Sequence, residues 1–595
     1  MNKKAKVAYI SAEYGIEGLP FLGGGLGTLA GDASKSFADL GLPVVGIGIY
    51  YHKGNFHQVL LEDGWQLEQY RNFDPTRIME YQYVNLEVPI ENRKVKVNAW
   101  RYDVTGETGH VVPIFFLDTN GNNDVQTNDD NICDILYPAG NQYHRLAQKQ
   151  ILGNGGVRLL DKLGFGDLDK YHINESHAAL AGTALMEKYG SVEEVRKHLA
   201  YTTHTPVPAG IGKYPPDLVR LVLGNDFYSK HQIKNLTGSD DSDDLNMARL
   251  AMALSSEAFG VSQLHAQVSK YMFKDYPNMD RLYSIDNGVH VQTWASLEFQ
   301  KLYDSSTNRQ WRLHPKTLEG ILRLSDEQVI NAHEVSRARL GHFLETDTRV
   351  KGWQHYDNQK LTLGFARRFA TYKQATLMFE QMDRLIRLGK DVQIVFSGKA
   401  HPSDNPGKEV IKEVFNYMKE LAGEVSIWFI EDYHMDVAKY LVRGVDVWVN
   451  NPMRLLEASG TSGMKAAVNG VPQFSIPDGW FLPQEPLDGY SLPKGLIEGV
   501  TGWGIGRLPT EADFSMLLDG HESWLRRQED RRRDAEDFYG KLEGIIIPLF
   551  KYDKPGWAEV MKSAIACNGS WYNTHRMVMQ YFEKAYGIPI EELIV

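Results

Sequence analysis

The chain has 595 residues, of which 64 are Lys or Arg and 76 are Asp or Glu, so its formal net charge is −12. At roughly 100–200 residues per domain, this length predicts about two to four domains. The acidic balance argues against nucleic acid as the main partner, because phosphate backbones bind basic surfaces. With 43% hydrophobic residues and near-average Gly and Pro, the composition also excludes a collagen-like or wholly disordered chain.

The two cysteines, Cys133 and Cys567, lie far apart, and neither belongs to a C-x-x-C pair. We therefore expect reduced thiols rather than a disulfide framework. No apolar run reaches the ~18–20 residues that cross a bilayer. The N-terminus reaches Glu13 before the apolar core of a signal peptide forms. These features predict a soluble, cytoplasmic protein with no membrane partner.

The first half of the chain opens in α/β style. We expect a strand at 6–10, a Gly-rich turn, a helix at 26–40 and a strand at 42–50. Segments that alternate polar and apolar residues follow at 81–88 and 95–102. Helical patterns return at 145–163, 177–188 and 242–255, and a long polar helix is expected at about 326–344.

The second half alternates apolar, β-branched runs with helical patterns. Strands are predicted at 361–366, 392–397, 425–430, 445–449 and 471–476, and helices at 373–388, 407–421, 434–442 and 462–468. Short continuous apolar strands between helices indicate a parallel sheet covered on both faces, as in a Rossmann-like domain. We place a boundary near Gly352 and predict domains at 1–352 and 353–560. The helices of 561–595 are expected to cross back to the first domain.

The Gly-rich segment 23–31 lies between a predicted strand and a predicted helix. Glycines let a ligand approach the backbone, and a helix N-terminus attracts anions, so an anion or sugar-phosphate site is expected there. A tight turn without a ligand is the alternative. A dinucleotide site is disfavoured, because the next strand ends in Gly48-Ile49-Tyr50-Tyr51 without an acid to bind a ribose.

His172 and His177 flank Glu175, but their spacing does not suit a metal site on one helix. Five residues turn by about 500°, so the two rings diverge. The spacing also departs from H-E-x-x-H, and we predict no metal.

Arg367, Arg368 and Lys373 follow the first strand of the second domain. In open α/β sheets ligands bind at the carboxyl ends of strands, and Arg and Lys suit phosphate. A basic surface turn is the alternative interpretation.

The most informative segment runs from Glu457 to Lys465, EASGTSGMK. A turn of Gly, Ser and Thr that opens a helix offers free N–H groups to a phosphate. We expect Lys465 in the first helical turn, the unfavourable end for a cation, where apolar flanks lower its pKa as a Schiff-base lysine requires. A lysine that extends to solvent is the alternative.

At these residues the sequence resembles the α-glucan (glycogen and maltodextrin) phosphorylases, in their short prokaryotic form. The resembling segments follow the family's order from about Ala8 to Asp478, with one more near the C-terminus. They are GGGLGTLAGD, YHINESHAAL, YTTHTPVPAG, SIDNGVHVQTW, GFARRFATYK, FSGKAHP, FIEDYHMDVAKYLVRGVDVWVNN, EASGTSGMKAAVNG and NTHRMVMQYF. The resemblance implies the GT-B fold, in which two Rossmann-like domains face a central cleft. It also implies reversible phosphorolysis of terminal α-1,4-glucosyl units to α-glucose 1-phosphate with retention.

The resemblance implies a role for each matching residue. Lys465 would anchor pyridoxal 5′-phosphate covalently, with Tyr433 and Trp294 beside the cofactor and Gly460, Thr461, Ser462 and Arg367 at its 5′-phosphate. Arg368, Lys373 and the Gly25 backbone would bind inorganic phosphate. The glucosyl unit would contact Leu26, His204, Asn287, Glu457, Ser459 and Gly460. Lys465, Arg368, Lys373 and His204 are thus the implied catalytic residues.

The implied chemistry brings two phosphate groups together among cations and amides. Substrate phosphate donates a proton to the glycosidic oxygen, so a pair of glycosidase carboxylates is not required. The implied partners are an α-glucan and inorganic phosphate. The resemblance does not decide whether glycogen or maltodextrin is preferred. It also leaves the oligomeric state open, with a homodimer as one possibility. The short form implies no allosteric regulation.

The segment 478–506 departs from the short form, because it is longer and richer in Pro and apolar residues. Trp480, Phe481, Tyr490 and Trp503 offer flat faces to sugar rings, and this segment is expected to shape the glucan path. The alternative is that these aromatic residues only pack the segment onto its own domain. Two rival functions remain: a nucleotide-sugar-dependent GT-B glucan synthase, which needs no lysine-bound cofactor, and a glucan-binding protein without activity.

Overall fold

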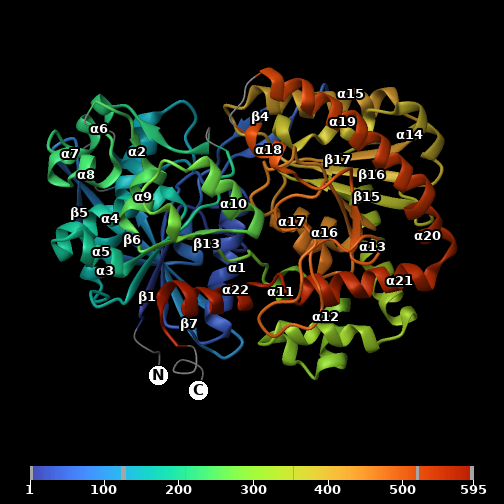
Figure 1. Cartoon of the computed structure of the whole chain (residues 1–595), viewed down its shortest axis with the longest axis horizontal. Coiled ribbons are helices and arrows are strands. Elements are labelled where there is room, and N and C mark those ends of the chain that lie inside the picture. Colours follow the sequence, from blue (N-terminus) through green and yellow to red (C-terminus); the bar gives the residue numbers. More distant parts are fainter. Residues whose placement is uncertain are drawn as a thin grey trace. The chain divides into compact units, whose positions relative to one another are not determined.

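A computed structural model describes residues 5–121, 129–207, 210–240, 242–352, 354–517 and 521–589, so Pro208 and Ala209 of the segment YTTHTPVPAG lie outside the described residues. The chain forms two compact units (Figure 1). Unit 1 comprises Met1–Phe56, Tyr70–Asp286 and Met577–Val595, and unit 2 comprises His57–Gln69 and Asn287–Arg576. The division predicted from the sequence, 1–352, 353–560 and 561–595, remains a proposal. In the contact-based division, 287–352 groups with unit 2 and 577–595 with unit 1.

Unit 1 contains a nine-stranded sheet among its described residues. Its order is β13 (Leu282–Ser284), β12 (Glu257–Gly260), β9 (Leu199–Thr202), β8 (Lys170–Asn174), β1 (Val7–Ser11), β2 (Val44–Ile49), β7 (Val111–Asp118), β6 (Arg93–Thr105) and β5 (Glu80–Ile90). The pairs β7–β6 and β6–β5 are antiparallel, and the other pairs are parallel. The central strands β1 and β2 are buried along their whole length, as expected for strands covered on both faces.

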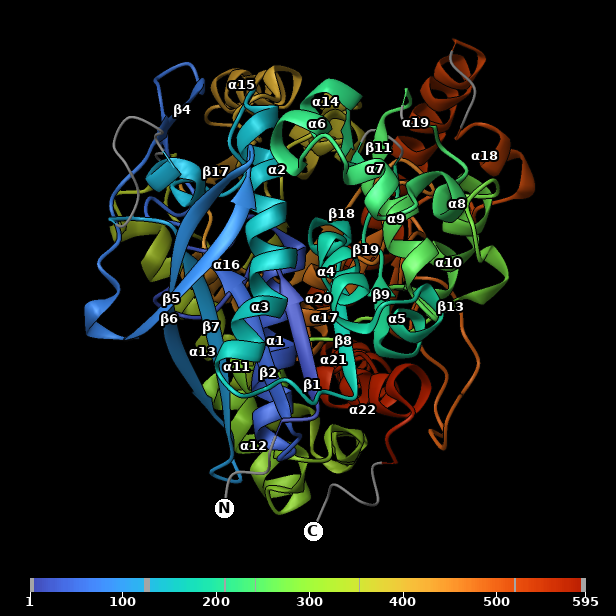
Figure 2. The ribbon, with the colours of Figure 1, turned by 90° about the vertical axis from the view of Figure 1, so that its left-hand side faces the viewer.

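The helices of unit 1 connect and cover these strands. They are α1 (Gly25–Asp39), α2 (Gln142–Gln150), α3 (Gly156–Lys162), α4 (Leu180–Tyr189), α5 (Val192–His198), α6 (Pro216–Leu223), α7 (Phe227–Lys230), α8 (Ile233–Thr237), α9 (Met247–Leu254) and α10 (Gln263–Met272). A π-helical turn, Ile151–Gly155, joins α2 to α3, and these segments contact β1, β2, β5 and β7 (Figure 2). A small two-stranded sheet pairs β10 (Lys213–Tyr214) with β11 (Leu245–Asn246). The C-terminal helix α22 (Thr574–Tyr581) brings Met577 and Val578 into the core of unit 1.

Unit 2 contains a seven-stranded sheet among its described residues. Its order is β14 (Val350–Lys351), β17 (Ser426–Ile430), β16 (Val392–Ser397), β15 (Leu361–Ala366), β18 (Val447–Asn450), β19 (Gln473–Ser475) and β20 (Gly502–Gly504). Only β14 pairs antiparallel to its neighbour. A hairpin of β3 (His57–Leu60) and β4 (Gln66–Gln69) also belongs to this unit, although residues 1–56 and 70–286 around it belong to unit 1.

The helices of unit 2 are α11 (Val291–Trp294), α12 (Leu297–Thr307), α13 (Asp326–Thr346), α14 (Met382–Leu388), α15 (Asn405–Glu420), α16 (Met435–Gly444), α17 (Thr461–Ala467), α18 (Glu511–Ser515), α19 (His521–Lys541), α20 (Ile547–Tyr552) and α21 (Lys554–Ser563). A capping box of Ser325 and Gln328 starts α13. The helix predicted at 373–388 is wrong in its first half. Gln374 has a left-handed backbone, φ 49°, and the segment forms 3₁₀ turns until α14 begins.

The two sheets share one topology. Counted along the chain, the strands β7-β2-β1-β8-β9-β12 of unit 1 and β17-β16-β15-β18-β19-β20 of unit 2 both follow the order 3-2-1-4-5-6. This is the Rossmann order, and its connections reverse direction between strands 1 and 4. Ligands of such sheets bind where the loops after these two strands separate. Topology therefore predicts the ligand-binding loops: those after β1 and β8 in unit 1, and those after β15 and β18 in unit 2.

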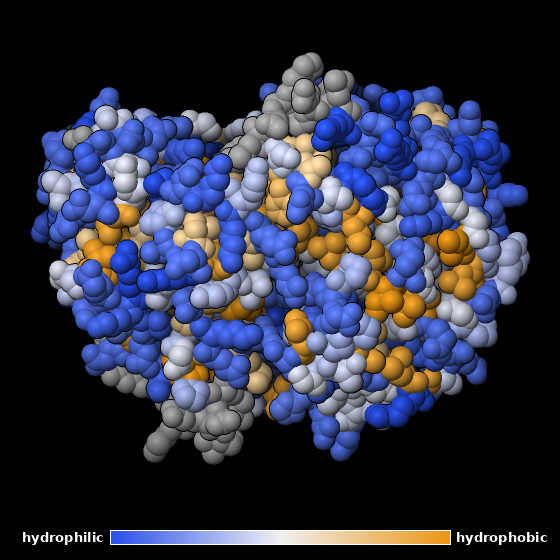
Figure 3. Space-filling model, viewed as in Figure 1, coloured by the Kyte–Doolittle hydropathy of each residue, from blue (hydrophilic) through white to orange (hydrophobic). Residues whose placement is uncertain are grey.

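The surface is mainly hydrophilic on the face that Figure 3 shows, with small hydrophobic groups between polar side chains. Among the described residues, none of the helices combines the length and hydropathy that crossing a bilayer demands.

Candidate active site

The switch point of unit 2 gathers cations around one carboxylate. Arg367 follows β15, and Glu457 lies on the loop after β18. The Glu457 carboxylate accepts a hydrogen bond from Arg367 and another from Lys373, whose Nζ lies 2.5 Å from Oε2. Arg367 also donates to Asn450, the last residue of β18. The three side chains of the ion-pair cluster are each about nine-tenths buried.

This cluster carries excess positive charge. Burial alone would raise the pKa of Glu457, but Arg367 and Lys373 outweigh it and lower that pKa to about 2. Burial likewise acts to raise the pKa of Tyr372, and Lys373 and Arg368 reverse it to below its ordinary value. The cations thus lower the pKa of two acids at one place, and the same positive field would stabilise a phosphate.

Arg368 is the exposed member of the cation group. Its guanidinium donates to the Tyr372 hydroxyl at 3.1 Å, while Arg367 and Lys373 both bind Glu457. The sequence predicted that Arg368 and Lys373 bind inorganic phosphate and that Arg367 binds the cofactor phosphate. That division stays a prediction, because in this structure Lys373 and Arg367 both pair with Glu457. The Arg368 guanidinium is oriented by Tyr372 and open to an incoming anion.

Lys465 is buried on α17 beside Trp294. Its Nζ lies 4.1 Å from the centre of the Trp294 ring, a cation–π distance. The Asn469 amide ties the two residues together, donating to the Lys465 carbonyl at 2.9 Å and to the Trp294 carbonyl at 3.1 Å. The alternative of a lysine that extends to solvent is wrong for this conformation, since Lys465 is 6% exposed.

The position of Lys465 in its helix differs from the prediction. Helix α17 begins at Thr461, after Gly460 with φ 87°, so Lys465 is the fifth residue and lies in the last turn of a seven-residue helix. A cation is favoured rather than disfavoured there. The helix dipole therefore gives no reason for a lowered lysine pKa, and burial against Trp294 is what distinguishes this lysine.

The turn before α17 is held by two indoles. The Trp480 ring N–H donates to the Gly460 carbonyl at 3.0 Å, and the Trp448 ring N–H donates to the Ser462 hydroxyl at 3.1 Å. A Cβ on Gly479 would meet the Ser459 carbonyl at 2.4 Å, so that glycine is required by close packing. The geometry of 459–462 is thus fixed before a ligand binds.

Several buried polar atoms of this region have no hydrogen-bond partner. They are Nε of Arg367, the side-chain hydroxyl of Ser459, and both amide atoms of Asn451. Native proteins leave few buried polar groups unsatisfied, because each costs about 1–3 kcal/mol. Of these groups, the Arg367 guanidinium, together with the buried Lys465 amine, fits the donor set that pyridoxal 5′-phosphate requires.

Tyr433 and Asn287, also in unit 2, complete the predicted set. Tyr433 follows β17; burial raises the pKa of its hydroxyl, and the nearby Arg367 guanidinium offsets part of that rise. Asn287 is buried, its side-chain oxygen has no partner, and its carbonyl accepts from Arg576 at 3.0 Å.

The segment 478–506 packs onto its own unit. Trp480, Phe481 and Trp503 are at most 1% exposed, so for these three the packing alternative is confirmed and no face is left for a sugar. Tyr490 is half-buried against Trp571, with ring centres 4.7 Å apart. The short strand β20 lies in this segment and was not predicted.

Asp478 starts this segment beneath the Glu457 backbone. Its carboxylate accepts from the backbone N–H groups of Glu457 at 3.0 Å and Gly479 at 2.8 Å. Burial, with a smaller contribution from the Glu457 charge, raises the pKa of Asp478 to about 8.

In unit 1 the Gly-rich loop already binds a carboxylate. Glu13, after β1, accepts from the backbone N–H groups of Gly23 at 2.6 Å and Gly24 at 2.9 Å, and from the Tyr137 hydroxyl. Those two amides are therefore not available to an external anion. Gly25 and Leu26 begin α1, and a Cβ at Gly25 would meet nothing within 4 Å, which leaves open space at its backbone.

His204 lies at the same switch point of unit 1. Its Nε2 is 2.7 Å from the Asn174 side-chain oxygen, and its backbone N–H donates to Glu175 at 2.7 Å. Burial lowers the pKa of His204 to about 4, so the ring is neutral near neutral pH. Both ring nitrogens of His172 have partners, Tyr586 at 2.6 Å and Thr202 at 2.8 Å, which assigns it to the core.

Of the predicted site residues, twelve belong to unit 2, whereas Gly25, Leu26 and His204 belong to unit 1. Among the twelve, Glu457 contacts Arg367 and Lys373, and Lys465 contacts Trp294. Sequence reasoning missed Glu13, Asn469 and Trp448. Asn469 lies in the resembling segment EASGTSGMKAAVNG, four residues after Lys465, at the spacing that places it one helical turn away. Glu13 has no such signal, because its partners come ten and eleven residues later.

Two Rossmann-like sheets, one with a cation cluster and a buried lysine at its switch point, define an α/β enzyme that acts on an anionic group. A family model described as carbohydrate phosphorylase matches residues 118–481. Maltodextrin phosphorylase of Thermococcus litoralis is 35% identical over 99% of this chain and 71% of its own length. Glycogen phosphorylases of Aquifex aeolicus and Mycobacterium tuberculosis are 33% and 34% identical, over 99% and 98% of this chain and 87% and 70% of their own lengths. The chain belongs to the carbohydrate phosphorylase family.

This membership confirms the predicted family, the α/β fold class of GT-B type and the enzyme class, a glycosyltransferase. It gives no support to the nucleotide-sugar-dependent synthase. The family generally depends on pyridoxal phosphate, and the central cleft stays a prediction.

Proposed function

We propose that this enzyme catalyses reversible phosphorolysis of the terminal α-1,4-glucosyl units of an α-glucan, giving α-glucose 1-phosphate with retained configuration. The observation that carries the proposal is the cluster of Arg367, Arg368 and Lys373 around one carboxylate at the switch point of unit 2. Two anions can meet there only because three cations surround them. Its relatives' names support glycogen or maltodextrin as the glucan.

Lys465 is the proposed covalent anchor of pyridoxal 5′-phosphate. The Trp294 face limits where the amine points, and Asn469 holds both backbones. Tyr433 is proposed to lie beside the cofactor, and Arg367 with the backbone of Gly460, Thr461 and Ser462 to bind its phosphate. When bound, the cofactor supplies a phosphate group next to the substrate phosphate, and its aldehyde takes no part in breaking the glycosidic bond.

Arg368 and Lys373 are proposed to bind inorganic phosphate. Lys373 must then exchange its Glu457 partner for the phosphate, so Glu457 becomes free to accept a hydrogen bond from a glucosyl hydroxyl. The bound phosphate donates its proton to the glycosidic oxygen and stabilises the positive charge that develops on the glucosyl ring. The cations hold that phosphate in place throughout.

The remaining contacts to the glucosyl unit are proposed for Ser459, Gly460 and Asn287 of unit 2, of which the Ser459 hydroxyl and the Asn287 side-chain oxygen lack a partner of their own. The glucosyl contacts expected for Gly25, Leu26 and His204, which belong to unit 1, stay predictions. With reduced, buried thiols, a cytoplasmic location is proposed.

The decisive experiment is release of glucose 1-phosphate from glycogen or maltodextrin by the purified protein, with and without inorganic phosphate. Borohydride reduction of the loaded protein, followed by peptide mapping, identifies the anchoring lysine. We expect strictly phosphate-dependent release and one modified peptide that contains Lys465. Cofactor on any other peptide would refute the anchor, and release without phosphate would refute the reaction.

A further inference from the structure

The hairpin of β3 and β4 is anchored to the loops of the unit 2 sheet. The Gln58 amide donates to the Gly398 carbonyl at 2.9 Å, and its oxygen accepts from the Asp432 backbone N–H at 2.9 Å. On β4, the Gln66 amide oxygen accepts from the Ala400 N–H at 2.8 Å, and its nitrogen donates to the Ala400 carbonyl at 2.9 Å. Gln58 and Gln66 thus fix the hairpin against the loops after β16 and β17.

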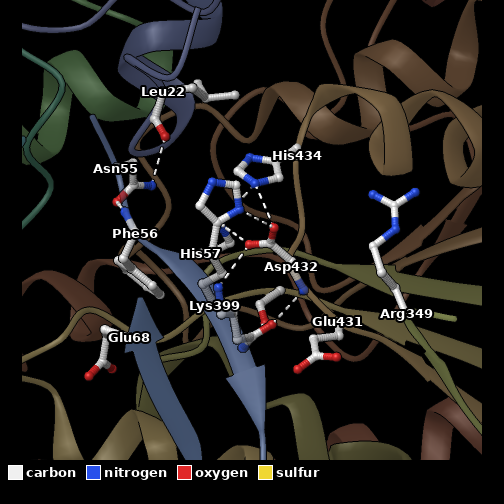
Figure 4. A network of polar contacts seen from close by, with 12 residues as sticks. Leu22, Asn55, Phe56, His57, Glu68, Arg349, Lys399, Glu431, Asp432 and His434 are labelled. Atoms are coloured by element: carbon white, nitrogen blue, oxygen red, sulfur yellow. Dashed lines mark hydrogen bonds and ion pairs between the residues drawn. The ribbon is translucent and has the colours of Figure 1, made fainter. Parts of the chain in front are cut away.

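Two histidines converge on one carboxylate oxygen at this junction. Nδ1 of His57 and Nε2 of His434 each lie 2.9 Å from Oδ2 of Asp432 (Figure 4). The three atoms all lie within 4.8 Å of one another. His57 begins the hairpin, whereas Asp432 and His434 follow β17, so the three ligand atoms come from two segments far apart in the chain.

These atoms have the types and spacing of a transition-metal site. Ligands around a tetrahedral Zn²⁺, at about 2.0–2.2 Å from the ion, are about 3.3–3.6 Å apart. Two imidazole nitrogens and one carboxylate oxygen leave the fourth position for water, as in open zinc sites. A small lengthening of the two contacts of 2.9 Å would admit the ion.

The second oxygen of Asp432 is held in place. Oδ1 accepts from the Gln58 backbone N–H at 2.9 Å and forms an ion pair with Lys399 at 2.6 Å. Ligating carboxylates are commonly oriented in this way by donors on the other oxygen. The side chains of His57 and His434 are 32% and 30% exposed, so an ion and a water ligand reach them from solvent.

We propose that His57, Asp432 and His434 form a binding site for one divalent transition-metal ion of the Zn²⁺ class. The ion would bridge the hairpin to the loop after β17. That loop contains Tyr433, so the metal would fix the segment on which the proposed cofactor contact lies. The proposal does not depend on the proposed function.

The test uses the full-length, cofactor-loaded protein, stripped with a chelator and kept in phosphate-free buffer. Titration calorimetry with Zn²⁺ is compared for the native protein, His57→Gln, His434→Gln and a matched control, His355→Gln, whose ring is exposed and far along the chain from the site. We expect one site in the native and control proteins. Each ligand variant should weaken it by at least about 100-fold, since even outer partners of metal ligands are worth about 10–100-fold.

A second measurement covers the case in which a variant does not fold. Cobalt(II) bound to the native protein should give the strong visible absorption of a four-coordinate site, and hydrogen exchange at the Gln58 and Leu60 amides should slow when Zn²⁺ is added. No Zn²⁺ binding by the native protein, unchanged exchange at those amides, or native Zn²⁺ affinity in either ligand variant would each overturn the proposal.

Discussion

The switch points of the two sheets have the same strand topology but present different chemical groups. In unit 2 the candidate anion-binding groups are side-chain cations, and the carboxylate of Glu457 pairs with two of them, Arg367 and Lys373. In unit 1 the donors are the Gly23 and Gly24 amides, and Glu13 satisfies both. A cation cluster keeps excess charge after pairing, whereas two neutral amides bound to a carboxylate leave a net negative charge.

This difference supports the proposal that phosphate binds in unit 2. The anion site expected from the glycines of unit 1 remains a prediction for the Gly25 backbone alone, because the Glu13 carboxylate already accepts from the Gly23 and Gly24 amides. Glycine there serves the close packing of the loop: a Cβ on Gly27 would lie 2.7 Å from a Glu13 oxygen.

The largest effect is expected from removing the carboxylate at each switch point. Glu457→Gln leaves two buried cations without a counter-ion, which should cost about 3–5 kcal/mol of unfolding free energy in the cofactor-free protein. Glu13→Gln weakens bonds to neutral donors and should cost about 1.5–3 kcal/mol. Thermal melts with added inorganic phosphate distinguish the two: phosphate should restore Glu457→Gln and leave Glu13→Gln unchanged. Equal rescue of both would break the comparison.

Arg368→Ala tests the exposed cation. A charge-assisted hydrogen bond is worth about 1.5–3 kcal/mol, so phosphate-dependent kcat/KM should fall by roughly 10- to 150-fold with cofactor content retained. Arg384→Ala, which removes a partly buried guanidinium paired with Glu536 and Glu543 in the same unit, is the control and should not change phosphate kinetics. If the two variants behave alike, Arg368 does not bind phosphate.

The pH dependence of stability tests Asp478 beneath the cluster. Its folded pKa is raised to about 8 from 3.8, so the folded state holds a proton that the unfolded state has released. The corresponding stability is complete below pH 3.8 and is lost as pH rises through about 8, by at most about 1.4 kcal/mol per pH unit. Urea melts of Asp478→Asn between pH 5 and 9 should show a smaller decline than the native protein; parallel curves would exclude this origin.

Trp480→Phe tests whether the segment 478–506 supports the cofactor turn. Losing the hydrogen bond to the Gly460 carbonyl should cost about 0.5–1.5 kcal/mol and weaken cofactor retention by roughly 2- to 10-fold. Trp503→Phe is the control, since the buried Trp503 ring N–H has no partner to lose. Loss of cofactor in both variants would point to general packing instead.

The thiols are expected to give the smallest effect. Burial raises the pKa of Cys567, in unit 2, to about 11 and raises that of Cys133, in unit 1, further. At pH 8 about one in a thousand Cys567 side chains is a thiolate, so a disulfide reagent should label the folded protein slowly, Cys567 first, and both thiols at once in denaturant. Fast labelling of Cys133 in the native protein would contradict the structure.

The strands of unit 2 could be predicted well because their burial makes them continuous apolar runs. Strands β15 and β16 have the predicted bounds, 361–366 and 392–397. Strand β20 was missed, since three residues with two glycines carry no β-strand pattern. The helix at 373–388 failed at Gln374, where tertiary context imposes a left-handed backbone on a residue with ordinary helix propensity.

The features of the candidate site likewise divide into those that the sequence could locate and those that it could not. Lys465 and the cations are local features of recognisable segments, so the sequence located them. The pairing of Glu457 with Arg367, ninety residues away, and of Glu13 with the Gly-rich loop depends on which loops the fold brings together. Neither pairing produces a pattern in the sequence that could have predicted it. The sequence also gave no sign that the hairpin 57–69 belongs to unit 2.

That hairpin also constrains how the enzyme is made. His57 leaves the ribosome long before Asp432, its partner 375 residues later, so the hairpin must wait unpaired while the intervening chain is synthesised. Contacts of such separation form late and slow folding. A gene fragment that begins at Asn287 would produce unit 2 without its hairpin, and the Gly398 and Ala400 backbone would lack its glutamine partners. The two halves of this enzyme are therefore expected to be inseparable as expression products.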